Sequence, residues 1–170
     1  VLGSDEESQY LNGIKLDADD LAIDGNGHAI DAQGLTRIFY CTGKNVTIKN
    51  APTAIHMLYG DVEVDGLTTE SIKDKNIFVE EKTDSSNKTT VDVKNATLCK
   101  TSSHSVHIKD EDATATLENV QILGTSSNHG IMAEGGDVNL KDITINGVAG
   151  SGIRINKATS QVTGDKITIS

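Results

Sequence analysis

The sequence predicts an all-β fold, a right-handed, single-stranded parallel β-helix of about seven coils. A short apolar strand pattern recurs at intervals of roughly 20–25 residues, which is typical of solenoid proteins. A Gly, Asn or Asp follows each second strand at one fixed offset. The chain also has 16 Gly, no Trp and only 3% aromatic residues, which does not suit a fold anchored by large aromatic side chains.

The first strand of each predicted coil has two inward apolar residues that flank one outward residue. The period of two is typical of a strand with one buried face. We expect these strands at residues 13–16, 37–40, 54–57, 76–79, 105–108, 130–133 and 152–155.

A second strand with the same alternation follows each first strand after a short turn. These strands are expected at residues 21–23, 46–48, 62–64, 91–93, 115–117, 138–140 and 160–162. Two positions beyond each of them stands a residue type that tolerates the left-handed conformation required at a tight corner. The seven expected corner residues are Gly25, Asn50, Gly66, Asn95, Asn119, Asp142 and Gly164.

A third strand leaves the corner in most coils, and its inward residues are mainly β-branched. We expect it at residues 28–30, 96–98, 120–122, 143–145 and 167–169. Three short strands per coil would enclose a thin column of stacked Ile, Val and Leu, which explains why Trp is not needed.

We expect one domain at residues 11–170, preceded by a polar leader at residues 1–10. Residues 81–90 are polar and read as a surface loop inserted into the fourth coil. The last residues continue a strand pattern, so we expect the chain to be a fragment of a longer solenoid.

The charge balance excludes two classes of partner. Fifteen Lys and Arg against 25 Asp and Glu leave a net charge of −10. Binding to nucleic acid or to anionic lipid requires a basic face, so neither is expected. No apolar stretch approaches the length of about 20 residues that a membrane-spanning helix needs.

Residues 12–50 resemble the first coils of right-handed parallel β-helix surface proteins, the adhesin-like family within the pectate-lyase-like superfamily. The segment at residues 23–31 (IDGNGHAID) and Arg37-Ile38-Phe39 carry the likeness. The second half is similar to autotransporter passenger domains through residues 129–131 and 151–155. The resemblance implies an extracellular, secreted or cell-surface location and an adhesive or scaffold role. The implied partner is a glycan or a surface protein of another cell.

The outward residues of the predicted first strands form a candidate binding column. Exposed aromatic, His and Met side chains on one sheet face suit sugar rings or a protein partner. The alternative is that the 81–90 loop folds over the column and buries it. The expected binding residues are Phe39, His56, Phe78, His107, Met132 and Arg154, with Lys15 at the end of the column.

A polysaccharide hydrolase or lyase acting on acidic glycans is the alternative function. Acids follow the fourth and fifth first strands, and paired carboxylates perform acid–base glycoside chemistry or hold Ca²⁺. His129 and Arg154 faintly resemble polygalacturonase elements, but no Asn-Thr-Asp or Asp-Asp pair stands at the coil ends. The residues of this alternative are Asp110, Glu111, Asp112, His129 and Arg154. Solvated turn acids are the preferred interpretation, so no catalytic residue is expected.

No cofactor and no metal site are expected, because the five His lack metal-ligand spacing. The acidic turn of Asp17, Asp19 and Asp20 suits at most weak Ca²⁺ binding, since it lacks the rest of an EF-hand loop. Cys41 and Cys99 are expected on different faces two coils apart, too distant for a disulfide.

Overall fold

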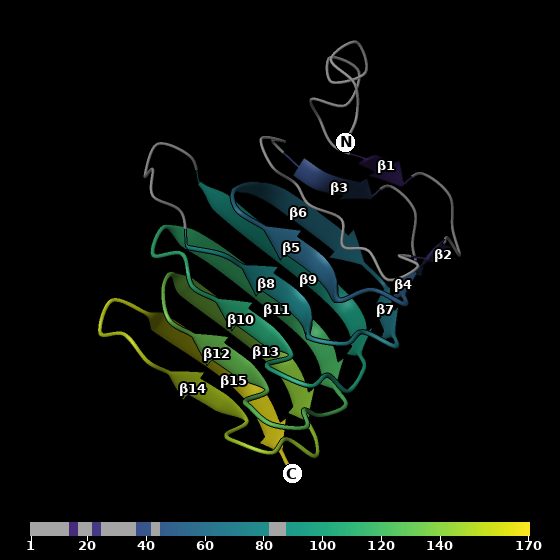
Figure 1. Ribbon diagram of the computed structural model, residues 1–170. Helices are drawn as coiled ribbons and strands as arrows, with labels where there is room; N and C mark the ends of the chain where they lie inside the picture. The colour runs from purple at the N-terminus through teal and green to yellow at the C-terminus, as the bar shows by residue number, and fades with distance from the viewer. Residues whose placement is uncertain (1–13, 17–21, 25–36, 42–44, 82–87) are drawn as a thin grey trace.

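The computed structural model describes residues 14–16, 22–24, 37–41, 45–81 and 88–170. These residues form fifteen β-strands, and no helix lies among them. The strands are β1 Ile14–Leu16, β2 Ala22–Asp24, β3 Arg37–Cys41, β4 Val46–Lys49, β5 Thr53–Met57, β6 Gly60–Asp65, β7 Leu67–Glu70, β8 Lys75–Val79, β9 Thr89–Leu98, β10 Val106–Ile108, β11 Ala113–Ile122, β12 Ile131–Ala133, β13 Asp137–Ile145, β14 Ile153–Ile155 and β15 Gln161–Ile169. Figure 1 shows them stacked as successive turns of a solenoid, which confirms the predicted all-β parallel β-helix.

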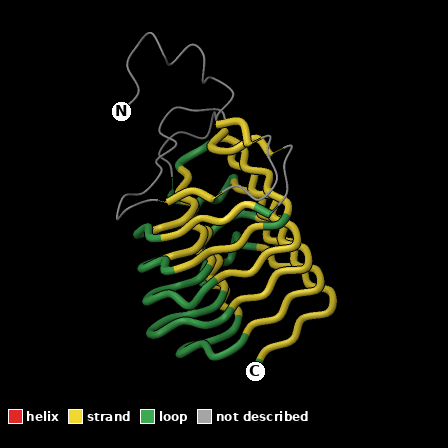
Figure 2. The backbone as a smooth tube through the Cα atoms, turned by 90° about the vertical axis from the view of Figure 1, so that its right-hand side faces the viewer, coloured by secondary structure: helices red, strands yellow, loops and turns green. Residues whose placement is uncertain are grey.

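The strands form two parallel sheets. Sheet B contains the five short strands β5, β8, β10, β12 and β14. Sheet A contains the other ten, and its long strands β9, β11, β13 and β15 each bend midway into a first and a second limb. In Figure 2 the long strands and the loops of each turn lie in separate stacks. A turn therefore consists of one sheet B strand, two limbs of sheet A and a closing loop.

The expected count of seven coils is wrong, because the described residues form five strands of sheet B, which define about five turns. Strands β1 and β3 were expected in the first-strand stack, but β1 pairs with β3 and β3 pairs with β6 in sheet A. Strands β2 and β4 align with β7 and the second limb of β9. Alternation of apolar and polar residues marks a strand with one buried face, but it does not say which side of the turn the strand occupies.

The corner between the limbs of sheet A carries one residue with positive φ in each turn. The residues are Asn45 (61°), Gly66 (80°), Asn95 (51°), Asn119 (54°), Asp142 (53°) and Lys166 (54°). Four expected corners are thereby confirmed. Asn and Asp, like Gly, adopt this conformation with little strain, which explains why the pattern was visible in the sequence.

Two expected corners are wrong, and one lies outside the described residues. Asn50 has a φ of 55° but follows the far end of β4, so Asn45 holds the corner of that turn. Gly164 pairs with Leu140 within the first limb, and Lys166 takes the corner of the last turn. Gly25 is the position that the structure does not describe.

Replacing Lys166 by Asn is expected to raise the free energy of unfolding by about 0.5–1 kcal/mol, because a left-handed Lys is strained where Asn is tolerated. The ion pair from Lys166 Nζ to Asp142 Oδ1, at 3.3 Å, is exposed and adds little. Urea denaturation measures the change. Lys141→Asn, in extended backbone on β13, is the control and should not stabilise. Equal effects of both substitutions would contradict the corner assignment.

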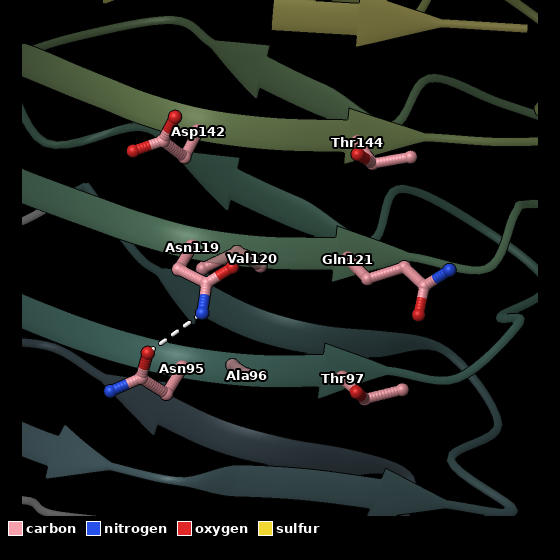
Figure 3. Close-up of a pocket in the computed structure, with 8 residues that line it drawn as sticks. All are labelled: Asn95, Ala96, Thr97, Asn119, Val120, Gln121, Asp142 and Thr144. Atoms are coloured by element: carbon pink, nitrogen blue, oxygen red, sulfur yellow. Dashed lines mark hydrogen bonds between the residues drawn. The ribbon is translucent and has the colours of Figure 1, made fainter. Parts of the chain in front are cut away.

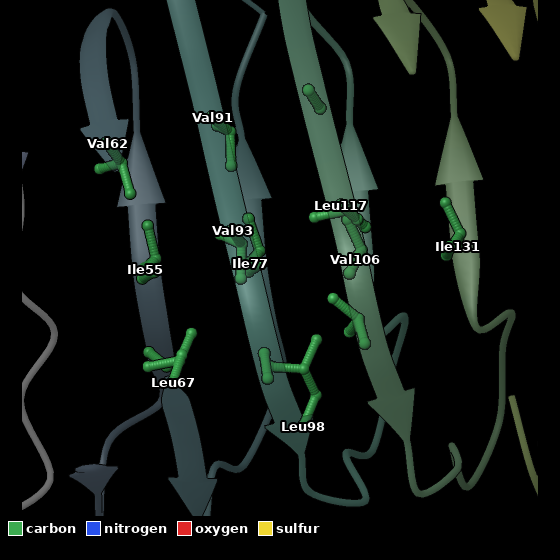
Figure 4. Close-up of a cluster of buried hydrophobic side chains, with 14 of the residues drawn as sticks. Ile55, Val62, Leu67, Ile77, Val91, Val93, Leu98, Val106, Leu117 and Ile131 are labelled. Atoms are coloured by element: carbon green, nitrogen blue, oxygen red, sulfur yellow. The ribbon is translucent and has the colours of Figure 1, made fainter. Parts of the chain in front are cut away.

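The core is a thin column of aliphatic side chains from both sheets (Figure 4). Ile55, Ile77, Val106 and Ile131 stack from turn to turn along sheet B, and none of them is exposed. Val and Leu of the sheet A limbs face them across the column. Each such side chain contributes about 1.5–3 kcal/mol by leaving water, so many small contributions replace large aromatic anchors.

One amide side chain is buried within this column. Asn76 is 0% exposed, and its Oδ1 accepts a hydrogen bond from Thr69 Oγ1 at 2.6 Å. Its Nδ2 donates to the backbone oxygen of Cys99 and to Ser105 Oγ, both at 2.8 Å. The backbone N–H of Cys99 in turn donates to Thr69 Oγ1 at 2.8 Å. The amide thereby joins successive turns through a closed hydrogen-bond network.

Candidate functional site

The outward side chains of sheet B form one row in register, which we call the sheet B row. Strand pairing aligns His56 with Phe78, Phe78 with His107, His107 with Met132 and Met132 with Arg154. The structure thus brings together five of the six expected binding residues. Adjacent members lie about 4.8 Å apart along the solenoid axis, the spacing of neighbouring strands.

Phe39 does not belong to this row, which corrects its expected place in the binding column. It lies on β3, in sheet A, where it pairs with Ile14. Lys15 lies on β1 in the same sheet. The alternation along a strand shows which residues share a face of that strand, but it does not show which sheet the strand joins.

The row is also less exposed than expected. His107 is 9% exposed and Met132 is 6% exposed, whereas His56 and Phe78 are half-buried and Arg154 is exposed. The Phe78 ring of the neighbouring turn and the His104 ring of the same turn contact His107. A solvated stripe along the whole row is therefore wrong at His107 and Met132.

Aromatic and imidazole rings contact one another along the axis. The ring centroids of His56 and Phe78 are 4.9 Å apart and stacked, and those of Phe78 and His107 are 5.4 Å apart. His104 continues the series, at 4.7 Å from His107 and 5.3 Å from His129. The faces of these rings are thus partly occupied by contacts within the protein.

His104 and His129, with His107, form what we call the imidazole cluster. Sequence reasoning did not place His104 in any site and placed His129 only in the catalytic alternative. A signal was present, because each of these two His stands two residues before a sheet B strand. Parallel register puts such positions side by side, three residues before the members of the row.

Two members of the row pair with a glutamate of the next turn. His56 Nε2 lies 3.0 Å from Glu80 Oε2, and His107 Nε2 lies 3.0 Å from Glu134 Oε2. Each Glu follows a sheet B strand directly, so the same diagonal geometry repeats along the axis. Asn156 Nδ2 donates to the other oxygen of Glu134 at 3.2 Å. The carboxylates are therefore engaged in positioning the imidazoles.

The hydrogen bonds of the imidazole cluster favour its neutral form. His129 Nδ1 accepts from the backbone N–H of Ser151 at 2.9 Å, and His104 Nδ1 accepts from the backbone N–H of His129 at 3.3 Å. A nitrogen that accepts a hydrogen bond carries no proton. His107 Nδ1 is buried and has no hydrogen-bond partner in the described residues. A proton there would have no acceptor.

Burial lowers the pKa of all three imidazoles, because it disfavours the charged form. The pKa of His104 falls from 6.5 to about 4, with further contributions from the neighbouring His107 and His129. For His107 burial lowers the pKa, although Glu134 opposes the effect. For His129 burial and the charge of Arg154 act in the same direction, lowering the pKa. The cluster is therefore uncharged near neutral pH.

The residues of the catalytic alternative do not come together. Asp110 is 3% exposed, and it accepts hydrogen bonds at 3.2 Å from the hydroxyl of the first residue of β9 and from the backbone N–H of Asp112. Glu111 and Asp112 are exposed in the same turn after β10. His129 precedes β12, so it lies at the opposite end of sheet B, and Arg154 lies in the row. Asp110 stabilises a turn.

Within the part of the chain that the structure describes, no three His, Cys, Asp or Glu side chains are arranged to hold a metal ion. The weak Ca²⁺ site considered at Asp17, Asp19 and Asp20 lies outside the described residues. Cys99 is a half-buried free thiol.

No protein-family model, curated protein or solved structure matches this chain. The adhesin-like resemblance is thus supported at the level of the parallel β-helix alone. Among the described residues, no helix has the length and apolar character that crossing a bilayer requires.

Proposed function

We propose that this chain is an adhesin-like binding solenoid, displayed outside the cell, whose sheet B row binds a protein partner on another surface. The observation that carries the proposal is the residue content of that row. Aromatic residues and Arg are enriched at the centres of protein interfaces, and half-buried Phe78 and exposed Arg154 share this one face.

The first limb of sheet A presents a different kind of surface. One of its outward rows alternates in charge from turn to turn, through Asp65, Lys94, Glu118, Lys141 and Asp165. Lys141 Nζ lies 2.5 Å from Glu118 Oε1 across the strands, and Lys94 Nζ lies 3.3 Å from Asp92 Oδ2 on its own strand. Lysines that are already paired offer little to a partner, which favours sheet B as the recognition face.

Arg154 is the group best placed to contact a partner. It is exposed, and its guanidinium makes no hydrogen bond or ion pair with the described residues. Lys75 Nζ lies 4.9 Å from the Phe78 ring centre, but it is already paired with Asp74 Oδ2 at 2.6 Å. A carboxylate of the partner could pair with Arg154 in the two-bond geometry that makes Arg a frequent hot spot.

A sugar ring stacked on Phe78 is the less favoured use of the row. Such stacking requires a free ring face, and the His56 and His107 rings contact Phe78 from the two neighbouring turns. No contact among the described residues favours the polysaccharide hydrolase or lyase alternative, since Asp110 is committed to its turn.

Beads that carry the chain are expected to adhere to a panel of microbial and animal cells, and Arg154→Ala should weaken binding by about 30-fold, the loss of one hot-spot residue. Lys141→Ala, which removes the same charge from sheet A, is the matched control and should adhere normally. Counting the beads that stay attached under flow measures adhesion. Titrating the cells with the free chain measures the change in affinity.

Treatment of the cells identifies the partner class. The adhesion that Arg154→Ala removes should disappear when the cells are treated with protease and survive periodate oxidation of their glycans. Loss with periodate alone would assign the row to a glycan. Absence of adhesion to every cell type would leave a scaffold role and overturn the proposal.

A further inference from the structure

A shallow polar channel crosses the corner of sheet A, away from the sheet B row (Figure 3). Its volume is about 230 Å³, and it runs across β9, β11 and β13 in the direction of the solenoid axis. The lining residues are Asn95, Ala96, Thr97, Asn119, Val120, Gln121, Asp142 and Thr144. Sequence reasoning assigned the corner residues a backbone role only and did not find the channel.

Two rows of side chains form the banks of the channel. One bank consists of the corner residues Asn95, Asn119 and Asp142. The other bank stands two residues further on in each strand, where alternation turns the side chain outward, as Figure 3 shows for Thr97, Gln121 and Thr144. The residue between the banks faces the core and is buried in each turn.

The second bank is part of a longer row. Strand pairing extends it to both sides, so that five of six successive positions are Thr. In register these positions are Thr47, Thr68, Thr97, Gln121, Thr144 and Thr168. The hydroxyl or amide groups of Thr97, Gln121 and Thr144 make no hydrogen bond within the described chain. A hydrogen-bonding group thus recurs about every 4.8 Å and is available to a ligand.

The side-chain hydrogen bonds of the first bank all run in one direction along the solenoid axis. The last amide in this series therefore keeps an oxygen that accepts no hydrogen bond from the next residue of the bank. Asn119 Nδ2 donates to Asn95 Oδ1 at 2.7 Å, and Asn95 Nδ2 donates to Asp65 Oδ1 at 2.6 Å. The next residue in the row is Asp142, whose carboxylate has no hydrogen to donate and whose Oδ1 is paired with Lys166 Nζ at 3.3 Å. Asn119 Oδ1 and Asp142 Oδ2 therefore present neighbouring acceptors, which a ligand hydroxyl can satisfy.

We propose that this channel binds a linear, neutral polysaccharide that lies along the solenoid axis, with about one sugar residue for each turn. An extended polysaccharide repeats its hydroxyl groups at nearly the spacing of the turns. Amides and hydroxyls on both banks match ligand hydroxyls, which both donate and accept. The residues that line the channel include no Lys or Arg, which disfavours a polyanion, and the site is independent of the protein partner proposed for sheet B.

Affinity gel electrophoresis tests the proposal, because it detects weak binding to polymers. The probes are hydroxyethylcellulose, galactomannan and laminarin as neutral polysaccharides and polygalacturonate as the anionic comparison. At least one neutral polymer should retard the chain, and polygalacturonate should not. The double variant Thr97→Val and Thr144→Val keeps side-chain shape and should weaken retardation at least about tenfold.

The matched control is Thr114→Val with Thr116→Val, on the first limb of β11, which should be retarded like the parent chain. Thermal melting followed by circular dichroism confirms that both double variants are folded. Arg154→Ala should also be retarded normally, so failure of the sheet B proposal leaves this one standing. No retardation by any neutral polymer, or equal retardation of both Thr variants, would overturn it.

Discussion

Replacing Asn76 by Ala is expected to lower the free energy of unfolding by about 3 kcal/mol, among the larger effects that a single polar residue can have. The substitution leaves Thr69, Ser105 and the Cys99 carbonyl without the partner they have at 2.6–2.8 Å. Thr69 and Ser105 are buried, so water cannot replace the amide freely. In a chain of this length the loss corresponds to a melting temperature lower by about 6–12 °C.

Asn139→Ala is the matched control, because Asn139 accepts a single hydrogen bond from Thr163 on the exposed face. It should cost less than about 0.5 kcal/mol. Asn76→Asp keeps the shape of the side chain but loses the two donated hydrogen bonds, so it should resemble Asn76→Ala. Urea denaturation measures all three. A loss at position 76 no greater than the loss at position 139 would show that the network does not stabilise the fold.

Acidification from pH 7.5 to pH 5 is expected to destabilise the protein through the imidazole cluster. The pKa of His104 is 6.5 in an unfolded chain and about 4 in the fold. Between these values the unfolded state binds a proton that the folded state does not, so stability falls as pH falls. Allowing for its partial exposure, His104 alone contributes roughly 1–2 kcal/mol at pH 5. His107 and His129, whose pKa values are also lowered, act in the same direction.

The contribution of the imidazole cluster is measured as the difference between the free energy of unfolding at pH 7.5 and that at pH 5. His104→Gln removes one titrating group and should reduce the difference by roughly 1–2 kcal/mol. Ser103→Ala, at the neighbouring position, should leave the difference unchanged. An unaltered pH dependence in His104→Gln would mean that the cluster is not held in its neutral form.

The repeating parts of the fold were visible in the sequence because they depend on local geometry. Alternation predicts which side of a strand is buried, and it correctly predicted that Ile77 and Val79 face inward and Phe78 faces outward. Positive φ favours Gly, Asn and Asp, so corners such as Asn95 and Asn119 could be found from residue type. The last corner escaped this rule because it holds Lys166.

The candidate sites depend on neighbours from other turns, which the sequence does not reveal. His107 lies on the outward face of its strand, as expected, yet it is buried because Phe78 and His104 contact it. Its pairing with Glu134 spans 27 residues and depends on the length of the intervening turn. Asp110 follows a strand as a catalytic acid would, but its hydrogen bonds commit it to the turn.

By itself the sequence determined the all-β solenoid, the inward aliphatic column and most corners, because each follows from the conformational preference of one strand or one residue. Only the tertiary structure decided that about five turns form sheet B, that Phe39 lies in sheet A and that three imidazoles form a cluster. It also placed the amide and hydroxyl banks beside each other. These features require the register between turns, which depends on how the loops between strands close and on how neighbouring turns pack, and not on the alternation within any one strand.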